Sequence, residues 1–399
     1  MQARDRIRFL IFFAILTSFG SSLSAIGTFL ALGREFHEIQ LVATALAVKT
    51  LSSVLITRFT RVFVLKYDVY PSLLISQLSG IPPLLLLVLG FYLKNSTVIL
   101  VGMFFTGFSG NLLSLVFTPM VKELSQYEDI FKKWQGIQQI FLGFGALLAG
   151  FLSPWILDRQ GVNGLYFVDG STFLIAGFCL WLRRKWYCEN CSVKSILSPR
   201  ITLEQIKLKD QAELKALVCI VPSFFFTGLI PIVASSGMQA LLMQPAQLVE
   251  RLWMAESISN IVIGWAYFKY KILRVGKIVI FFPLFCAVPL FTIYLSHSAI
   301  LFYSTFLIYS ILYLYGFTRY RDDLISSAQD LEERVNHSAF HLFIVNLIRT
   351  LSAPVVSILI SYESSRFVGV PLRAIILIQL LMGGGSFLYL QRSSNRITA

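Results

Sequence analysis

Residues 69–93 read VYPSLLISQLSGIPPLLLLVLGFYL, a stretch that contains no charged side chain. An α-helix needs about 20 mostly apolar residues to cross the hydrocarbon core of a bilayer. This stretch is therefore long enough to cross a membrane once as a helix. Similar stretches recur along the chain, and their number and grouping indicate the fold.

About twelve such stretches can be distinguished, and we expect each to be a membrane-spanning helix. The first set lies at residues 8–32, 39–57, 69–93, 97–120, 135–157 and 164–183. The second set lies at residues 214–236, 247–268, 276–296, 298–317, 338–361 and 368–391. The longest polar segment separates the two sets. The sequence thus predicts an all-α, polytopic membrane protein with an N-terminal six-helix half at 1–183, a cytoplasmic central loop at 184–213 and a C-terminal six-helix half at 214–399.

Composition and charge support a bilayer environment. Of the 399 residues, 56% are hydrophobic and only 14% are charged, which leaves too little polar surface for a soluble protein of this size. The net charge is +13, and most of the 34 lysines and arginines lie in alternate loops. By the positive-inside rule, this pattern predicts that both termini are cytoplasmic. We expect the chain to lie in the cytoplasmic (inner) membrane. The cations follow topology, so we expect no nucleic-acid partner.

Several function classes lack their usual sequence signals. Cys188 and Cys191 form a lone CxxC with no histidine nearby, which cannot complete a tetrahedral zinc site. No phosphate-binding loop and no HExxH motif occur. We therefore expect no metal, no cofactor and no enzymatic activity. The expected partners are a small-molecule substrate and the lipid bilayer, and the expected state is a monomer.

Three short segments carry a resemblance to a known family. One is LYFVDGSTFL at residues 165–174, where the sixth helix is expected to begin. The second precedes and enters the fifth helix and contains Pro119, Glu123, Leu124 and Gln138. The third is QDLEER at residues 329–334. Together with the six-plus-six plan, they make nearly the whole chain resemble the major facilitator superfamily, nearest to the enterobactin-type siderophore exporters and macrolide efflux proteins.

The chain also departs from that family. The stretch 57–68 keeps its cations and Asp68 but lacks the glycine and the upstream acid of the family signature. The fifth helix has no Gly-Pro pair. An internal repeat is indicated by two polar stretches of mixed charge, Lys122–Gln135 and Arg319–Asn336, which we expect to be cytoplasmic loops before the fifth and eleventh helices.

Three ionisable residues fall inside predicted spans: Lys49, Glu256 and Arg349. A charge at the centre of a membrane helix costs about 2.5–3.5 kcal/mol even on the most lenient scale, so such residues mark functional sites by default. The family resemblance implies that helices two and eleven meet at the junction of the halves, as do helices five and eight. Two cations against one carboxylate leave a positive surplus, which favours a negatively charged substrate. Asp169 is expected to be an interfacial or capping residue.

The predicted substrate-binding set contains these charges and nearby amides: Lys49, Arg349, Glu256, Asn260, Gln138, Gln139, Asn346 and Asn111. Glu256 and His341 are the candidate coupling residues. The alternative for the charges is a static ion pair that holds the halves together. For amides such as Asn111, Gln77 and Gln139, the alternative is hydrogen bonding between helices. For His341 it is a hydrogen-bonded position near a helix end.

The function that these features favour is secondary active transport by alternating access. The expected substrate is a small anionic organic solute, such as a siderophore-like compound or a carboxylate metabolite, moved by ion-coupled export. The alternatives are import of a ferric siderophore or anionic nutrient, general drug efflux, and a receptor that transports nothing.

Overall fold

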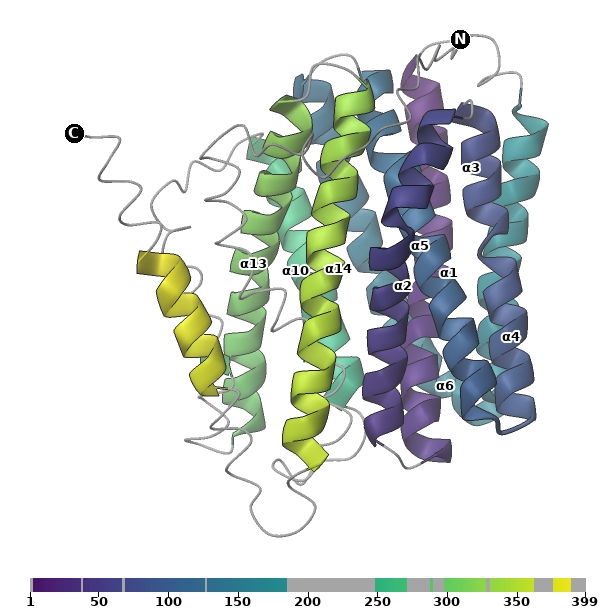
Figure 1. Ribbon diagram of the computed structural model, residues 1–399. Coiled ribbons are helices and arrows are strands. Elements are labelled where there is room, and N and C mark those ends of the chain that lie inside the picture. Colours follow the sequence, from purple (N-terminus) through teal and green to yellow (C-terminus); the bar gives the residue numbers. More distant parts are fainter. Residues whose placement is uncertain are drawn as a thin grey trace.

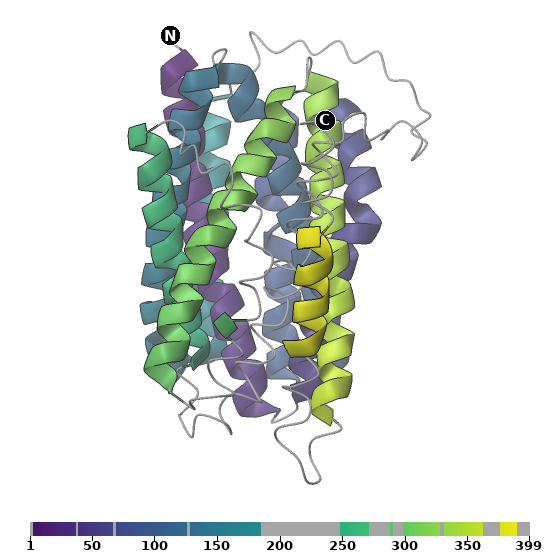
Figure 2. The same cartoon turned by 90° about the vertical axis from the view of Figure 1, so that its left-hand side faces the viewer.

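The computed structural model describes residues 3–36, 39–66, 69–125, 128–184, 248–270, 288–289, 298–327, 331–361 and 376–388. Within these residues all regular structure is helical. The long helices lie side by side in one bundle (Figure 1), and α13 is tilted relative to its neighbours (Figure 2).

The helices of the first part of the chain are α1 (Ala3–Glu35), α2 (Ile39–Lys66), α3 (Val69–Leu78), α4 (Ile81–Tyr92), α5 (Ser96–Ser125) and α6 (Glu128–Leu182). Those of the second part are α10 (Leu248–Tyr270), α13 (Ala299–Ser327), α14 (Leu331–Ser361) and a helix at residues 376–388. Four of the described segments are long and apolar enough to cross a membrane: Arg8–Glu35, Tyr70–Tyr92, Ser96–Phe117 and Lys133–Leu182. The chain is a multi-pass membrane protein.

The span predicted at 69–93 is one crossing made of two helices. The first, α3, ends at Leu78, and α4 begins at Ile81 with Pro82 and Pro83 in its first turn. Proline fits this position because the first backbone N–H groups of a helix have no acceptor within the helix. In the middle of a continuous helix the same residues would remove hydrogen bonds, so the helix restarts here.

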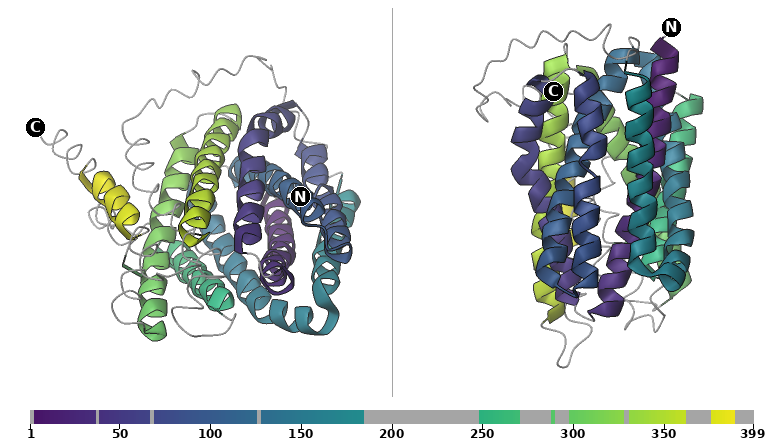
Figure 3. Two further views of the ribbon diagram at one scale, coloured as in Figure 1. Left: turned by 60° about the horizontal axis from the view of Figure 1, so that its bottom comes forward. Right: turned by 90° about the vertical axis from the view of Figure 1, so that its right-hand side faces the viewer.

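α6 contains two predicted spans, those at 135–157 and 164–183. A straight helix over the apolar segment Lys133–Leu182 would be about 75 Å long, more than twice the thickness of the hydrocarbon core. The helix is interrupted at Gly161, where φ is 66° and ψ is −167°. Glycine adopts this conformation without a steric penalty. The chain bends there, and two helices result (Figure 3).

The expected loops at Lys122–Gln135 and Arg319–Asn336 are largely helical, so this prediction was wrong. α5 continues to Ser125 and α6 begins at Glu128, while α13 continues to Ser327 and α14 begins at Leu331. Hydropathy marks where apolar side chains end, whereas a helix can continue into water with its backbone hydrogen bonds intact. Charged helix ends therefore looked like loops in the sequence.

Some predictions lie outside the described residues. These are the helix at 214–236, most of the helix at 276–296, the first part of the helix at 368–391 and the central loop except for residue 184. The division at 184–213 stays a prediction.

Helices from the two parts of the chain pack against each other along two lines. α2 packs on α14, and α10 packs on α6. We call these lines the α2–α14 seam and the α6–α10 seam. They confirm the pairing of helices two with eleven and five with eight that the resemblance implied.

Candidate functional site

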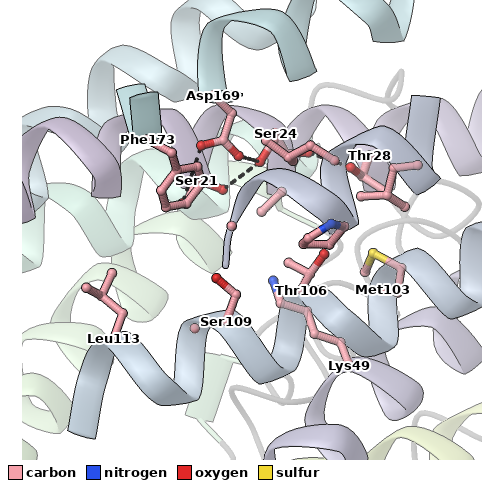
Figure 4. Close-up of a pocket in the computed structure, with 16 residues that line it drawn as sticks. Ser21, Ser24, Thr28, Lys49, Met103, Thr106, Ser109, Leu113, Asp169 and Phe173 are labelled. Carbon is pink, nitrogen blue, oxygen red and sulfur yellow. Dashed lines mark hydrogen bonds between the residues drawn. The ribbon is translucent and has the colours of Figure 1, made fainter. Parts of the chain in front are cut away.

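A cavity of about 110 Å³ lies among α1, α2, α4, α5 and α6 (Figure 4). Its polar lining comes from Ser21, Ser24, Thr28, Lys49, Thr106, Ser109 and Asp169. Its apolar lining includes Leu84, Leu87, Met103, Leu113 and Phe173. The cavity therefore combines one cation, one carboxylate and several hydroxyl groups with largely hydrophobic walls.

Small residues on α1 allow this helix to lie close to the second helix of α6. A Cβ atom added at Gly20 would stand 2.7 Å from Asp169 Oδ1, and one added at Gly27 would stand 2.0 Å from Leu165 Cδ1. As the neighbouring side chains lie, neither position has room for a Cβ atom. Small residues permit such close approach of membrane helices, and here they bring α1 within hydrogen-bonding distance of Asp169.

Asp169 is 2% exposed and forms part of the cavity wall. The Ser24 hydroxyl donates to its Oδ2 at 2.5 Å, and the Ser21 hydroxyl donates to its Oδ1 at 3.5 Å. The expectation of an interfacial or capping residue was therefore wrong. The signal that could have found this site is an aspartate inside the span 164–183 together with serines in the small-residue run of the first helix.

Lys49 lies on the opposite wall of the same cavity. Figure 4 shows its amine beside Thr106. No carboxylate of the described residues lies within 4 Å of this amine, so Lys49 and Asp169 share a cavity without a direct ion pair. Asp169 and Arg349 both act electrostatically on Lys49. Lys49 thus lines the cavity in the first part of the chain and also interacts electrostatically with Arg349 on α14.

The α2–α14 seam has a hydrogen bond at its centre. The Thr350 hydroxyl donates to the Thr50 hydroxyl at 2.8 Å. The residue before each threonine is a cation, and the sequence reads KTLS at 49–52 and RTLS at 349–352. In both segments the serine hydroxyl donates to the carbonyl of the cationic residue, at 2.9 Å from Ser52 and 2.8 Å from Ser352. This match was present in the sequence, but its meaning depends on the contact between the two segments.

Glu256 on α10 interacts electrostatically with Arg349 on α14. Asn260 lies one turn further along α10 and donates to the backbone carbonyl of Glu256 at 3.1 Å, within its own helix. The structure therefore links four ionisable groups in the order Asp169, Lys49, Arg349 and Glu256. We call this set the charge row. It holds two carboxylates and two cations, so the predicted positive surplus does not survive the inclusion of Asp169.

The predicted amides are placed differently. The Asn111 side-chain nitrogen donates to the Ser53 carbonyl at 2.6 Å and to the Thr57 hydroxyl at 2.8 Å, which joins α5 to α2. Gln139 is buried and Gln138 half-buried on the part of α6 before Gly161. Asn111 thus stabilises a contact between two helices. A substrate contact for Asn111, Gln138 or Gln139 stays a prediction.

Two further candidates lie on α14. Asn346 is half-buried, and its backbone carbonyl accepts from the Thr350 hydroxyl at 2.7 Å. His341 is 5% exposed. In the described part of the chain, no three side chains of His, Cys, Asp or Glu are grouped as a metal site would require.

No protein-family model matches the sequence, and no curated protein matches it. Among solved structures, the crystal structure of the human organic anion transporter MFSD10 (TETRAN) matches with a TM-score of 0.70. The match covers 98% of this chain and 100% of that chain, at 10% sequence identity. The chain has the major facilitator fold. Both the predicted all-α, polytopic architecture and this fold are confirmed, whereas a match at 10% identity says nothing about substrate.

Proposed function

We propose that the protein is a secondary active transporter that moves a small anionic organic solute between its two halves by alternating access. The observation that carries this proposal is the charge row, which runs across the α2–α14 seam. The carboxylate of Asp169 and the cation of Lys49 come from helices before the central loop. The carboxylate of Glu256 and the cation of Arg349 come from helices after it. Major facilitator carriers bind substrate where their halves meet.

The α2–α14 seam offers an anion a defined place. Lys49 and Arg349 are like charges that act on each other across this seam. A carboxylate between them would interact favourably with both and would relieve their repulsion. The guanidinium of Arg349 can hold a carboxylate through two parallel hydrogen bonds, whereas the Lys49 ammonium acts as a point charge.

The proposed substrate is a carboxylate metabolite or a siderophore-like compound, and the proposed location is the cytoplasmic membrane with both termini inside. The human transporter with the same fold acts on organic anions, which is compatible with this substrate class. Ion-coupled export follows the resemblance to siderophore exporters. Import of an anionic nutrient or ferric siderophore is the alternative direction, and Glu256 and His341 are candidate coupling groups in either case.

Counterflow in proteoliposomes tests this function. Labelled citrate and benzoate would represent carboxylates, and labelled tetraphenylphosphonium would represent cationic drugs. We expect counterflow of a carboxylate and none of the cation. Arg349→Ala should reduce carboxylate counterflow about 30-fold or more, since truncating one member of a buried charge pair costs about 2–5 kcal/mol.

Arg349→Lys is the matched control because it keeps the charge and loses only the two-pronged geometry. It should retain more counterflow than Arg349→Ala. If the charge row is only a static ion pair, Arg349→Ala would lower the unfolding temperature in detergent while the folded fraction transports normally. Cation counterflow without carboxylate counterflow would favour drug efflux, and absence of both would contradict this proposal.

A further inference from the structure

Asp169 and Lys49 line one cavity from opposite walls but do not touch. Two opposite charges in a nonpolar setting normally close into an ion pair, because separated charges there are costly. Here Asp169 is held on its wall by Ser21 and Ser24, and the close contact of Gly20 fixes the approach of α1. On the opposite wall, Gly107 of α5 packs directly against the backbone of α2 at Lys49. Both helices are thus held in place, and the gap remains.

The gap is large enough for water. A single buried water needs about 10–15 Å³ of such space, and the cavity has about 110 Å³. The hydroxyl groups of Thr28, Thr106 and Ser109 also line it. Water molecules that bridge polar groups across the gap would give Asp169 a path along which a proton can arrive and leave.

In the part of the chain that the structure describes, few charged groups surround Asp169. Lys49 of α2 faces it across the cavity, and Tyr166 lies one turn away on α6, with its hydroxyl hydrogen-bonded to Thr28 at 2.8 Å. The described cavity-lining residues of α1, α4 and α5 are hydroxyl-bearing, apolar or glycine. Among the described residues, Lys49 is therefore the group that responds most directly to the charge on Asp169.

Lys49 is shared between two environments. Asp169 attracts its charge from inside the first part of the chain, and Arg349 repels it across the α2–α14 seam. When Asp169 is ionised, it offsets the positive potential of Lys49. When Asp169 carries a proton, this offset is lost and the potential at the seam becomes more positive.

We propose that Asp169 is a proton-binding site whose occupancy strengthens anion binding between Lys49 and Arg349. This rests on the proposed transport function for the identity of the anion. The proton bonds to a carboxylate oxygen of Asp169, the anion binds at the seam, and the protein gains no net charge from the pair. Because linkage is reciprocal, each ligand raises the affinity for the other. Proton and anion then move in the same direction, so an inward proton gradient drives import of the anion, which is the direction given above as the alternative to export.

A cross-linking experiment tests the Asp169 site without any substrate. The double variant Thr50→Cys/Thr350→Cys would be made in the full-length chain with its five native cysteines replaced by serine. Protonation of Asp169 removes the negative charge that offsets Lys49, so the repulsion between Lys49 and Arg349 acts more strongly, which should loosen the seam and lower the disulfide yield. Asp169→Asn is the test variant. Asp158→Asn is the matched control, because Asp158 is a 62% exposed residue on the part of α6 before Gly161, paired with Arg34.

The measured quantity is the ratio of disulfide yields, Asp158→Asn over Asp169→Asn, which cancels the pH dependence of thiol chemistry. We expect a ratio near one under acidic conditions that rises to about fivefold or more under alkaline conditions, within the range of typical coupling strengths. A ratio that stays constant with pH would overturn the proposal. If Asp169→Asn does not fold, Lys49→Gln replaces it, and the ratio of its yield to that of Asp158→Asn should be near one under alkaline conditions and rise under acidic conditions. A ratio that stays constant with pH would equally overturn the proposal.

Transport separates this proposal from the proposed function. For a carboxylate that shows counterflow, an acidic exterior should drive accumulation in proteoliposomes, and Asp169→Asn should abolish accumulation while retaining counterflow. Accumulation driven by an acidic interior, or by a sodium gradient instead, would overturn the proton–anion linkage. Absence of counterflow in the unaltered protein would contradict the transport function alone, since the cross-linking ratio judges the Asp169 site independently.

Discussion

The α2–α14 seam and the α6–α10 seam hold the same two parts of the chain together by different means. At the α2–α14 seam, the threonine hydroxyls of Thr50 and Thr350 are hydrogen-bonded and a cation stands beside each. At the α6–α10 seam, glycines bring the two backbones together. A Cβ atom added at Gly136 would stand 2.8 Å from the Gly264 carbonyl oxygen, and one added at Gly264 would stand 2.6 Å from the Gly136 carbonyl oxygen.

The two kinds of contact respond differently to movement. Dispersion between closely packed backbones falls off steeply with distance, so the glycine contact is strong only at one separation. Charges act over longer distances and can exchange partners with water or a ligand. We therefore infer that the α6–α10 seam fixes the approach of the helices, while the α2–α14 seam carries the response to protons and anions.

The largest stability effect is expected at the α6–α10 seam. In Gly264→Ala, the new Cβ atom would meet backbone atoms of Gly136 and Ile140 at 2.6 Å, which a side-chain rotation cannot relieve. Overpacking of this kind costs about 1–3 kcal/mol. We expect a clear drop in the unfolding temperature of the protein in detergent.

The matched control for that variant is Gly33→Ala on α1, where nothing lies within 4 Å of the added atom. Alanine is a better helix former than glycine by up to about 1 kcal/mol, so this change should be neutral or slightly stabilising. Equal unfolding temperatures for the two variants would mean that the glycine contact does not define the seam.

A smaller effect is expected inside the first part of the chain, behind the α2–α14 seam. Asn111→Ala removes the hydrogen bonds from α5 to Ser53 and Thr57 of α2. Hydrogen bonds between membrane helices contribute about 0.6–2 kcal/mol each. We expect a lower unfolding temperature and an unchanged KM for the transported carboxylate. Ser114→Ala on the same helix is the control, since Ser114 is exposed and bonds only to its own helix at Gly110. A raised KM with normal stability would instead restore Asn111 as a substrate contact.

The sequence was sufficient for the fold because the bilayer imposes a strong length requirement on each helix. Spans such as 97–120 and 164–183 could be read from hydropathy alone, and α5 and α6 contain them. The helix ends were wrong because hydropathy reports side chains, whereas α13 and α14 extend beyond their apolar parts. The break between α3 and α4 was also missed, although Pro82 and Pro83 were visible in the sequence. It does not change the number of membrane crossings.

The candidate site was only partly predictable. Lys49, Glu256 and Arg349 could be found because a charge within an apolar run is conspicuous. Asp169 was wrongly expected at the interface or as a helix cap. Its burial depends on the close approach of α1 at Gly20, a contact between residues far apart in the sequence. The overall charge of the site could not be known until both carboxylates were placed.

The smallest expected effect isolates the hydrogen bond at the centre of the α2–α14 seam. Thr350→Val keeps the shape of the side chain and removes the donor to Thr50, which is 2.8 Å away. A double-mutant cycle with Thr50→Val should give a coupling free energy of about 0.6 kcal/mol, the average measured for such bonds between membrane helices. Thr305→Val on α13 is the control, because the Thr305 hydroxyl donates to carbonyls of its own helix. If the two seam substitutions are additive, the threonine pair contributes no coupling, and charge alone would distinguish this seam from the glycine seam.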